Sequence, residues 1–306
     1  MALRLALFLS FALLALAAPP LAGQTLQRDP VSGDFILEFT DFDGVHHRMV
    51  VEPRDKISPR MAVAIESSGA GYVYRYALTN EIGPRTQQPI GVVLLPCPGG
   101  DPSLSVEPAP GWNASASRTA RQPECEFSFR TAWLEPGQSV GDFIVRSAWL
   151  PAPASAWVFG RAKIASLPVS FEIVPDTVVE ILENIQGSYF NSIGGREVHT
   201  LVPARSPVTL DNPTSGLSLI RTDLDRACGE LGWITNAGVC RSLGEKLEAA
   251  SEVLTRFWVP KWRARRHLEA FLHELKAQHG PQPGKHVSDN AYWLLKINVE
   301  YVLSRL

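Results

Sequence analysis

The sequence carries almost no net charge and few cysteines. Lys and Arg number 29 and Asp and Glu number 31, which gives a formal charge of −2 at pH 7. A chain this close to neutral has no general attraction for nucleic acid, so we expect no nucleic-acid partner. Neither a C-x-x-C nor an H-E-x-x-H pattern occurs. Zinc and thioredoxin-type sites therefore lack support, and we expect no metal and no cofactor.

The sequence also lacks a long apolar run after its first residues. Residues 5–16 are apolar except for Ser10, they follow the charge of Arg4, and small residues and prolines dominate 17–23. This order is typical of a secretory signal peptide, predicted over residues 1–23, and it indicates a secreted, periplasmic or cell-surface protein. A membrane anchor is the alternative, but the run is shorter than the ~20 residues that cross a bilayer.

The cysteines are even in number, which favours disulfides in a chain expected to be exported. Four cysteines allow three pairings. We expect Cys97–Cys125 and Cys228–Cys240, because each pair then stays inside one predicted domain.

Residues 24–175 have the period of β-strands. Phe35, Leu37 and Phe39 alternate with polar residues, and Asp43-Gly44 marks a hairpin turn after them. Such runs, with Gly and Pro between them, predict an antiparallel sandwich of the immunoglobulin or fibronectin type. The runs are 34–42, 45–51, 61–66, 71–79, 90–95, 124–134, 140–148, 155–164 and 169–174.

The second half has the period of α-helices. Residues 176–216 are expected to form a short helix, 178–185, and then a linker that contains Pro203, Pro207 and Pro213. From Leu217 to Leu306, apolar stripes at a spacing of 3.6 predict four helices in two similar hairpins. Thr235 and Ser288 stand where the second and fourth helices need an N-cap. The fold class expected is therefore a β-sandwich followed by a four-helix, two-hairpin module.

Two stretches resemble known families. The stretch Leu231-Gly232-Trp233-Ile234-Thr235-Asn236-Ala237-Gly238-Val239-Cys240, continued by Leu268-x-Ala270-Phe271-x-x-Glu274-Leu275, resembles the FIMAH-type helical domain of secreted bacterial proteins over about residues 217–306. That resemblance implies an accessory module without catalytic residues, although the loop 280–284 is longer than the family pattern. The turn at 134–139 is similar to one common in immunoglobulin-like domains, and the β half otherwise resembles only uncharacterised exported sandwich proteins.

Three short patterns match parts of catalytic or metal-binding motifs, but the residues around them do not complete those motifs. Gly137-Gln138-Ser139-Val140-Gly141 fits the G-x-S-x-G elbow of hydrolases, but a strand follows where that elbow needs a helix. Asp41-x-Asp43-Gly44 matches only the start of a calcium loop, so we interpret it as the hairpin turn. His46 and His47 are neighbours on a strand and point to opposite faces, which separates them as metal ligands.

One basic run stands out, and its charged and aromatic residues are Lys261, Trp262, Arg263, Arg265 and Arg266. Basic residues interleaved with Trp bind polyanions or membrane surfaces. We favour a solvated helix face with Trp262 in the core over such a binding role.

We therefore expect an exported, non-enzymatic binding, adhesion or accessory protein. Its partner would be a cell-surface polymer or another exported protein. The alternative is a secreted hydrolase with a site on the sandwich, which would need a cleft with converging His and carboxylate side chains. No residue is predicted to be catalytic.

Overall fold

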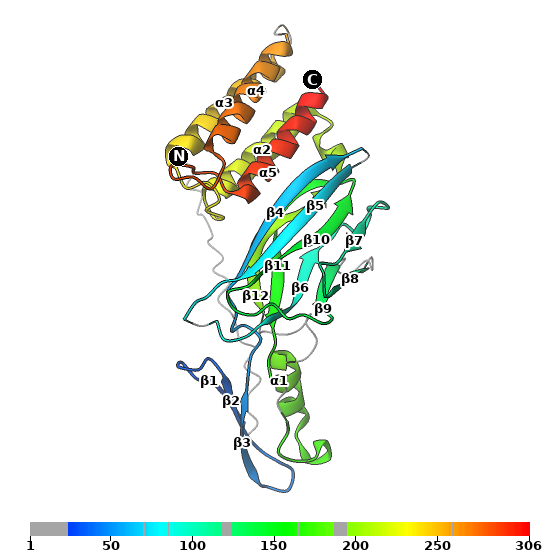
Figure 1. Ribbon diagram of the computed structural model, residues 1–306, viewed down its shortest axis with the longest axis vertical. Coiled ribbons are helices and arrows are strands. Elements are labelled where there is room, and N and C mark those ends of the chain that lie inside the picture. The colour runs from blue at the N-terminus through cyan, green and yellow to red at the C-terminus, as the bar shows by residue number, and fades with distance from the viewer. Residues whose placement is uncertain are drawn as a thin grey trace, which may run out of the picture. The chain divides into compact units, whose positions relative to one another are not determined.

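The structure, a computed structural model, is drawn in Figure 1. It describes residues 24–69, 71–84, 86–117, 124–163, 166–186, 195–256, 258 and 260–306. The signal peptide predicted over residues 1–23 lies outside these ranges. Antiparallel strands dominate the chain up to residue 205, and α-helices follow, in the order that the sequence predicts. The chain divides into two compact units, which are residues 1–53 with 162–194, and residues 54–161 with 195–306.

The first unit contains a small sheet and a helix. Strands β1 (Thr25–Arg28), β2 (Phe35–Thr40) and β3 (His46–Val51) pair in the order β1-β2-β3. Leu37 and Phe39 point to the side that helix α1 (Asp176–Gln186) covers with Val178 and Ile185. Strands expected inside the sandwich thus form a separate sheet, because their apolar face packs on residues more than a hundred positions later.

Two local expectations in this unit need correction. The hairpin turn is confirmed between β2 and β3, but only Gly44 has a positive φ, at 83°, and Asp43 does not share it. The Asp41 carboxylate accepts hydrogen bonds from the Asp43 and Val45 amides instead, which stabilises a wider turn. The run 169–174 is not a strand. Residues Phe171–Ile173 form a 3-10 turn, which leads into α1.

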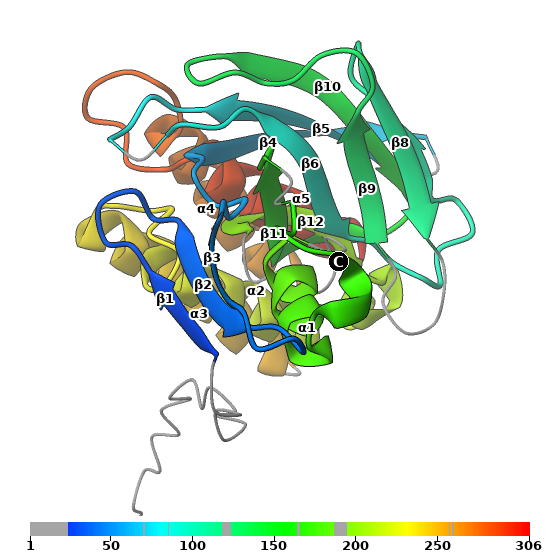
Figure 2. The ribbon, with the colours of Figure 1, turned by 90° about the horizontal axis from the view of Figure 1, so that it is seen from below.

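The second unit contains two antiparallel sheets, which Figure 2 shows as separate layers. One has the order β4-β5-β10-β7 and the other β12-β11-β6-β9-β8. The first sheet consists of Pro59–Ser68, Gly71–Asn80, Ser139–Ser147 and Ser105–Glu107 (β4, β5, β10 and β7). The second consists of Arg196–Arg205, Leu150–Gly160, Ile90–Pro96, Glu124–Phe129 and Trp112–Ser117 (β12, β11, β6, β9 and β8).

Aromatic residues fill the space between these sheets. Tyr74 and Tyr76 of β5 are buried, as their shared face in the sequence suggests, and the Tyr76 hydroxyl donates to the Leu201 carbonyl of the opposite sheet at 2.9 Å. Burial raises the pKa of both phenols. Phe127 and Phe143 contact each other across the core with ring centroids 5.1 Å apart. Two sheets packed face to face on one apolar core form a β-sandwich.

The predicted linker contains a strand that the sequence did not reveal. Residues Arg196–Arg205 pair along almost the whole length of β11, and this strand, β12, carries Pro203. Proline removes a donor and is tolerated in a strand at a sheet edge, where β12 lies. A proline inside the run therefore concealed a strand.

Helices α2 (Pro213–Cys228), α3 (Ala237–Thr255), α4 (Trp262–Gln278) and α5 (Asp289–Ser304) follow β12. Ser288 caps α5 as predicted, since its hydroxyl accepts from the Ala291 amide. Thr235 does not cap α3. Asn236 takes that position and accepts from the Gly238 and Val239 amides. Asn is as effective a cap as Ser, and it stands one residue nearer to the helix.

The two similar segments before α3 and α5 pair with each other. Ile234 and Val287 form an antiparallel bridge, the Thr235 amide donates to the His286 carbonyl, and the Ser288 amide donates to the Trp233 carbonyl. The internal similarity seen in the sequence thus places its two copies side by side. Both expected disulfides are present, with Cα atoms 5.6 Å apart for Cys97–Cys125 and 6.1 Å apart for Cys228–Cys240.

The helices and the sandwich share one continuous core. Helix α5 packs against β4 and β11, and the amide of the fully buried Asn298 donates to the Pro151 carbonyl at 3.0 Å. Arg205 of β12 and Asp223 of α2 form a two-bonded ion pair at 2.7 and 3.0 Å that is nearly closed to solvent. Burial raises the pKa of Asp223 more than Arg205 lowers it. The cost of removing the charged carboxylate from water is therefore larger than the gain from its ion pair.

Candidate functional site

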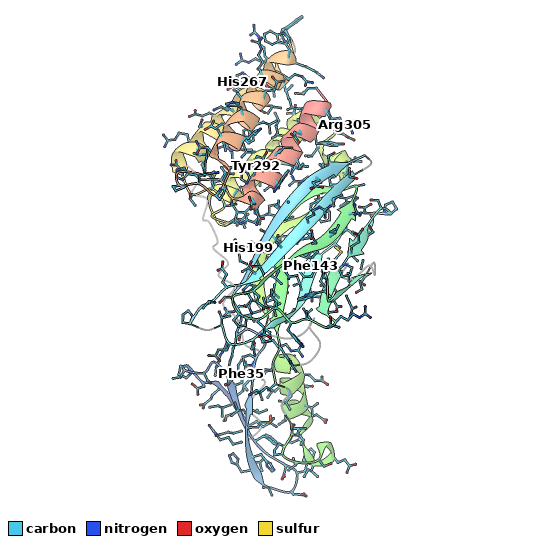
Figure 3. All side chains as sticks on the ribbon, in the orientation of Figure 1. Phe35, Phe143, His199, His267, Tyr292 and Arg305 are labelled. Atoms are coloured by element: carbon cyan, nitrogen blue, oxygen red, sulfur yellow. A yellow bond between two sulfur atoms is a disulfide. The ribbon has the colours of Figure 1, made fainter. Side chains whose placement is uncertain are left out.

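The basic run predicted from the sequence lies where α3 ends and α4 begins. We define the tip surface as the exposed residues Arg256, Trp258, Lys261, Trp262, Arg263 and Arg266. The end of α3 and the start of α4 lie at one end of the helix bundle, as does the end of α5 (Figure 1). Figure 3 shows the side chains of this region, with His267 on α4 and Arg305 at the end of α5 labelled.

Trp262 is not in the core. It is 49% exposed, and the buried positions of α4 are Ala264, Leu268, Phe271 and Leu275. These four residues follow one another at spacings of four and three, which turns Trp262 away from the buried stripe. The favoured interpretation, a solvated face with a buried tryptophan, is therefore right for the charges of this helix and wrong for Trp262.

Two arginines lie against the Trp262 ring. The guanidinium carbon of Arg266 is 4.7 Å from the ring centroid, and that of Arg263 is 5.6 Å away. A guanidinium over an indole is attracted by the negative face of the ring and keeps its hydrogen-bond donors free at its edge. This stack presents apolar area and positive charge in the same place.

Arg265 binds the end of α5. Its guanidinium donates to the Leu303 carbonyl at 3.1 Å, near the end of α5. Carbonyls in the last turn of a helix lack intrahelical donors, and a cation there also interacts favourably with the helix dipole. We therefore separate Arg265, which fastens α4 to α5, from the residues of the tip surface.

Sequence reasoning missed Trp258 and Arg256. Trp258 is 87% exposed, which is the highest value among the described tryptophans that are exposed. Arg256 reaches Glu252 at 3.6 Å, so part of its charge is balanced within α3. Both residues precede the basic run. Two features of the sequence point to them. Trp258 stands four residues before Trp262, and Arg256 stands two residues before Trp258.

The G-x-S-x-G match is a sandwich turn. Ser139 begins strand β10, is exposed, and lies 2.8 Å from the hydroxyl of Thr79 on the neighbouring strand β5. A hydrolase nucleophile needs a base within hydrogen-bond reach and a helix behind it. Ser139 is followed by a strand, as the sequence indicated.

The turn at Asp41 holds an Asp–His pair. His47 Nε2 lies 2.7 Å from Asp41 Oδ2, while Oδ1 of the same carboxylate accepts backbone amides. The hydrogen bond with His47 is the main cause that holds the pKa of Asp41 below its ordinary value. His46 is exposed on the opposite face. Both Asp41 oxygens serve the turn, which supports the hairpin interpretation over a calcium loop.

Histidines of the helices are spread along them. His279 Nε2 lies 2.7 Å from Asp289 Oδ1, and its ring is stacked on Tyr292 with centroids 4.0 Å apart. His286 lies 3.3 Å from the Thr235 hydroxyl, and His267 and His273 lie elsewhere on α4. Among the residues that the structure describes, no group of three or more His, Cys, Asp or Glu is placed to hold a metal ion.

A serine, a lysine and a glutamate meet between α3 and α4. Lys246 Nζ lies 2.6 Å from Glu274 and donates to the Ser242 hydroxyl at 2.8 Å, and that hydroxyl donates to Glu274 at 2.9 Å. The cluster therefore ties α3 to α4 through side chains of both helices.

Comparisons with known proteins find little similarity to this chain. No protein-family model matches the sequence, and no curated protein matches it. One similar solved structure is that of an uncharacterized protein from Nocardia farcinica with an immunoglobulin-like fold, at 19% identity and a TM-score of 0.26. The match covers 37% of this chain and 91% of the other. At that level of similarity the comparison assigns neither a family nor a function.

Proposed function

We propose that this protein is an exported, non-enzymatic binding or accessory protein that attaches to an anionic surface of the cell envelope through its tip surface. In this proposal the sandwich is of the immunoglobulin or fibronectin type, and the helices are a FIMAH-type accessory module. The observation that carries it is the pair of exposed tryptophans among clustered cations, with Arg263 and Arg266 stacked on Trp262.

The charge of the tip surface supports a negatively charged ligand. The whole chain has a formal charge of −2, whereas the tip surface contributes four cations within its eleven positions from Arg256 to Arg266 even before Arg265 is counted. Like charges crowded on one turn repel one another, and an anionic ligand relieves that repulsion. Exposed Trp side chains add apolar contact, which is typical of residues that dominate binding interfaces.

The attachment can be tested with a soluble and a membrane-bound polyanion. We expect the purified protein to bind either inorganic polyphosphate or vesicles that contain an anionic lipid, and to lose affinity as salt is raised. The R263Q/R266Q variant should bind more weakly. A protein that binds neither ligand, or a variant that binds as well as the wild type, would contradict the proposal.

The control for this experiment lies on the same two helices. Arg241 near the start of α3 and Lys276 near the end of α4 are exposed, and they are at the end of the hairpin away from the tip surface. R241Q/K276Q removes the same number of charges as R263Q/R266Q. If both variants lose affinity equally, net charge and not the tip surface is responsible.

A further inference from the structure

We infer that the ligand of the tip surface is an anionic phospholipid bilayer, with Trp258 and Trp262 placed in the headgroup region. This inference rests on the proposed function and names its partner. Three properties of the tip surface support it. Its tryptophans are exposed, its cations are close to them, and the start of α4 is held in place.

The tryptophans are open to solvent. Trp258 is 87% exposed and Trp262 is 49% exposed. Most of the surface of Trp258 and about half of that of Trp262 are therefore available to a ligand. A bilayer interface accepts such a group, because an indole has an apolar body and a polar N–H that prefer the boundary between water and acyl chains.

The cations are close to the tryptophans in the chain, and two of them contact the Trp262 ring. Lys261 and Arg263 flank Trp262 in sequence, Arg266 lies one turn further on α4, and Arg256 precedes Trp258. A linear polyanion is bound best by charges spaced along a groove. Charges next to exposed aromatic residues match a flat anionic surface, where the rings enter and the guanidinium groups remain with the phosphates.

The start of α4 is held in place. Leu268 and Ala264 anchor it in the core, and Arg265 binds the end of α5. Side chains on a firmly held helix start lose little conformational freedom on binding, so contact area is converted into affinity more efficiently. Within the described ranges no helix is long and apolar enough to cross a membrane.

The test uses vesicles of phosphatidylcholine with and without phosphatidylglycerol, and linear polyphosphate as the soluble polyanion. We expect binding to vesicles that contain phosphatidylglycerol, and little binding to pure phosphatidylcholine. Each basic residue near an anionic bilayer raises affinity about fivefold, so R263Q/R266Q should bind roughly 25-fold more weakly. R241Q/K276Q, which removes two charges at the other end of the hairpin, should stay within about twofold of the wild type.

Depth is measured with brominated phosphatidylglycerol, which quenches tryptophan fluorescence in the bilayer. Quenching should occur in the wild type and be lost in W258F/W262F, since the remaining tryptophans are not part of the tip surface. The phenylalanine variant should still bind, because it keeps the charges and most of the apolar area. Vesicle binding without quenching, or quenching that survives in W258F/W262F, would overturn the placement of the tryptophans.

The outcomes separate this inference from the proposed function. Binding to polyphosphate without binding to vesicles would overturn the bilayer and leave the polyanion proposal intact. Binding to neither would overturn both. Equal binding to vesicles with and without phosphatidylglycerol would show that charge recognition is absent, and it would also overturn the inference.

Discussion

Helices α5 and α4 belong to one bundle and have opposite surroundings. On α5, Asn298 and its apolar neighbours are buried against β4, β11 and the other helices. On α4 the buried residues form one stripe, and the rest of the surface is exposed and basic at its start. Helix α5 therefore joins the bundle to the sandwich, which leaves α4 free to present charge and aromatic area to a ligand.

The largest effect on stability is expected when one charge is removed from the buried ion pair between the helices and the sandwich. Asp223→Ala leaves Arg205 unpaired between α2 and β12, where both side chains are nearly closed to solvent. An uncompensated buried charge costs about 3–5 kcal/mol of unfolding free energy. Urea denaturation followed by circular dichroism measures this loss.

The matched control is two positions further along the same helix. Asp225 pairs with Arg221 at the surface, at 3.1 Å, and Asp225→Ala should cost about 0.5 kcal/mol or less. Equal losses for the two variants would show that Asp223 contributes no more to stability than a surface carboxylate. The buried ion pair would then not be what joins α2 to β12.

The disulfide between α2 and α3 comes next. It ties α3, and with it the α3–α4 hairpin, to the helix that carries Asp223. Replacing both Cys228 and Cys240 by Ser should cost about 3 kcal/mol, because the closed loop restricts the unfolded chain. The change is measured by denaturation of the oxidised variant against the oxidised wild type. Unchanged stability would show that helix packing alone holds this hairpin.

Asn298→Ala tests whether the sandwich and the helix bundle unfold together. The variant leaves the Pro151 carbonyl without its buried donor, which costs about 1–3 kcal/mol. Because the sandwich and the bundle share one core, the helical dichroism and the tryptophan fluorescence of the wild type should change at the same urea concentration. Lys296→Ala, at a half-buried position of α5 where the side chain pairs with Glu300, is the control. Two separate transitions would instead show that the helices fold independently.

The smallest effect on stability is expected at the tip surface. Trp258→Ala and Arg263→Gln remove exposed groups, and each should change the free energy of unfolding by less than about 0.5 kcal/mol. The same substitutions are expected to weaken binding to the anionic bilayer. If the tip variants are as unstable as Asp223→Ala, the residues support the fold, and a loss of binding in them would carry no information about a ligand.

The local elements could be predicted because each depends on near neighbours in the chain. The alternation around Leu37 and Phe39 gives β2, and the cap at Ser288 gives the start of α5. Strand β12 was missed, because Pro203 is acceptable only at a sheet edge and edges are not visible in a sequence.

Three features follow from residues that are close in the chain, and the sequence was enough to predict them. They are the change from period two to period 3.6, the pairing of the cysteines inside local segments, and the basic, aromatic run from Lys261 to Arg266. Long-range packing settled the rest. That β2 packs on α1 and α5 joins the sandwich depends on contacts between positions more than a hundred residues apart. Which residues around Trp262 face solvent also depends on packing, because the neighbours of α4 determine which of its faces stays uncovered.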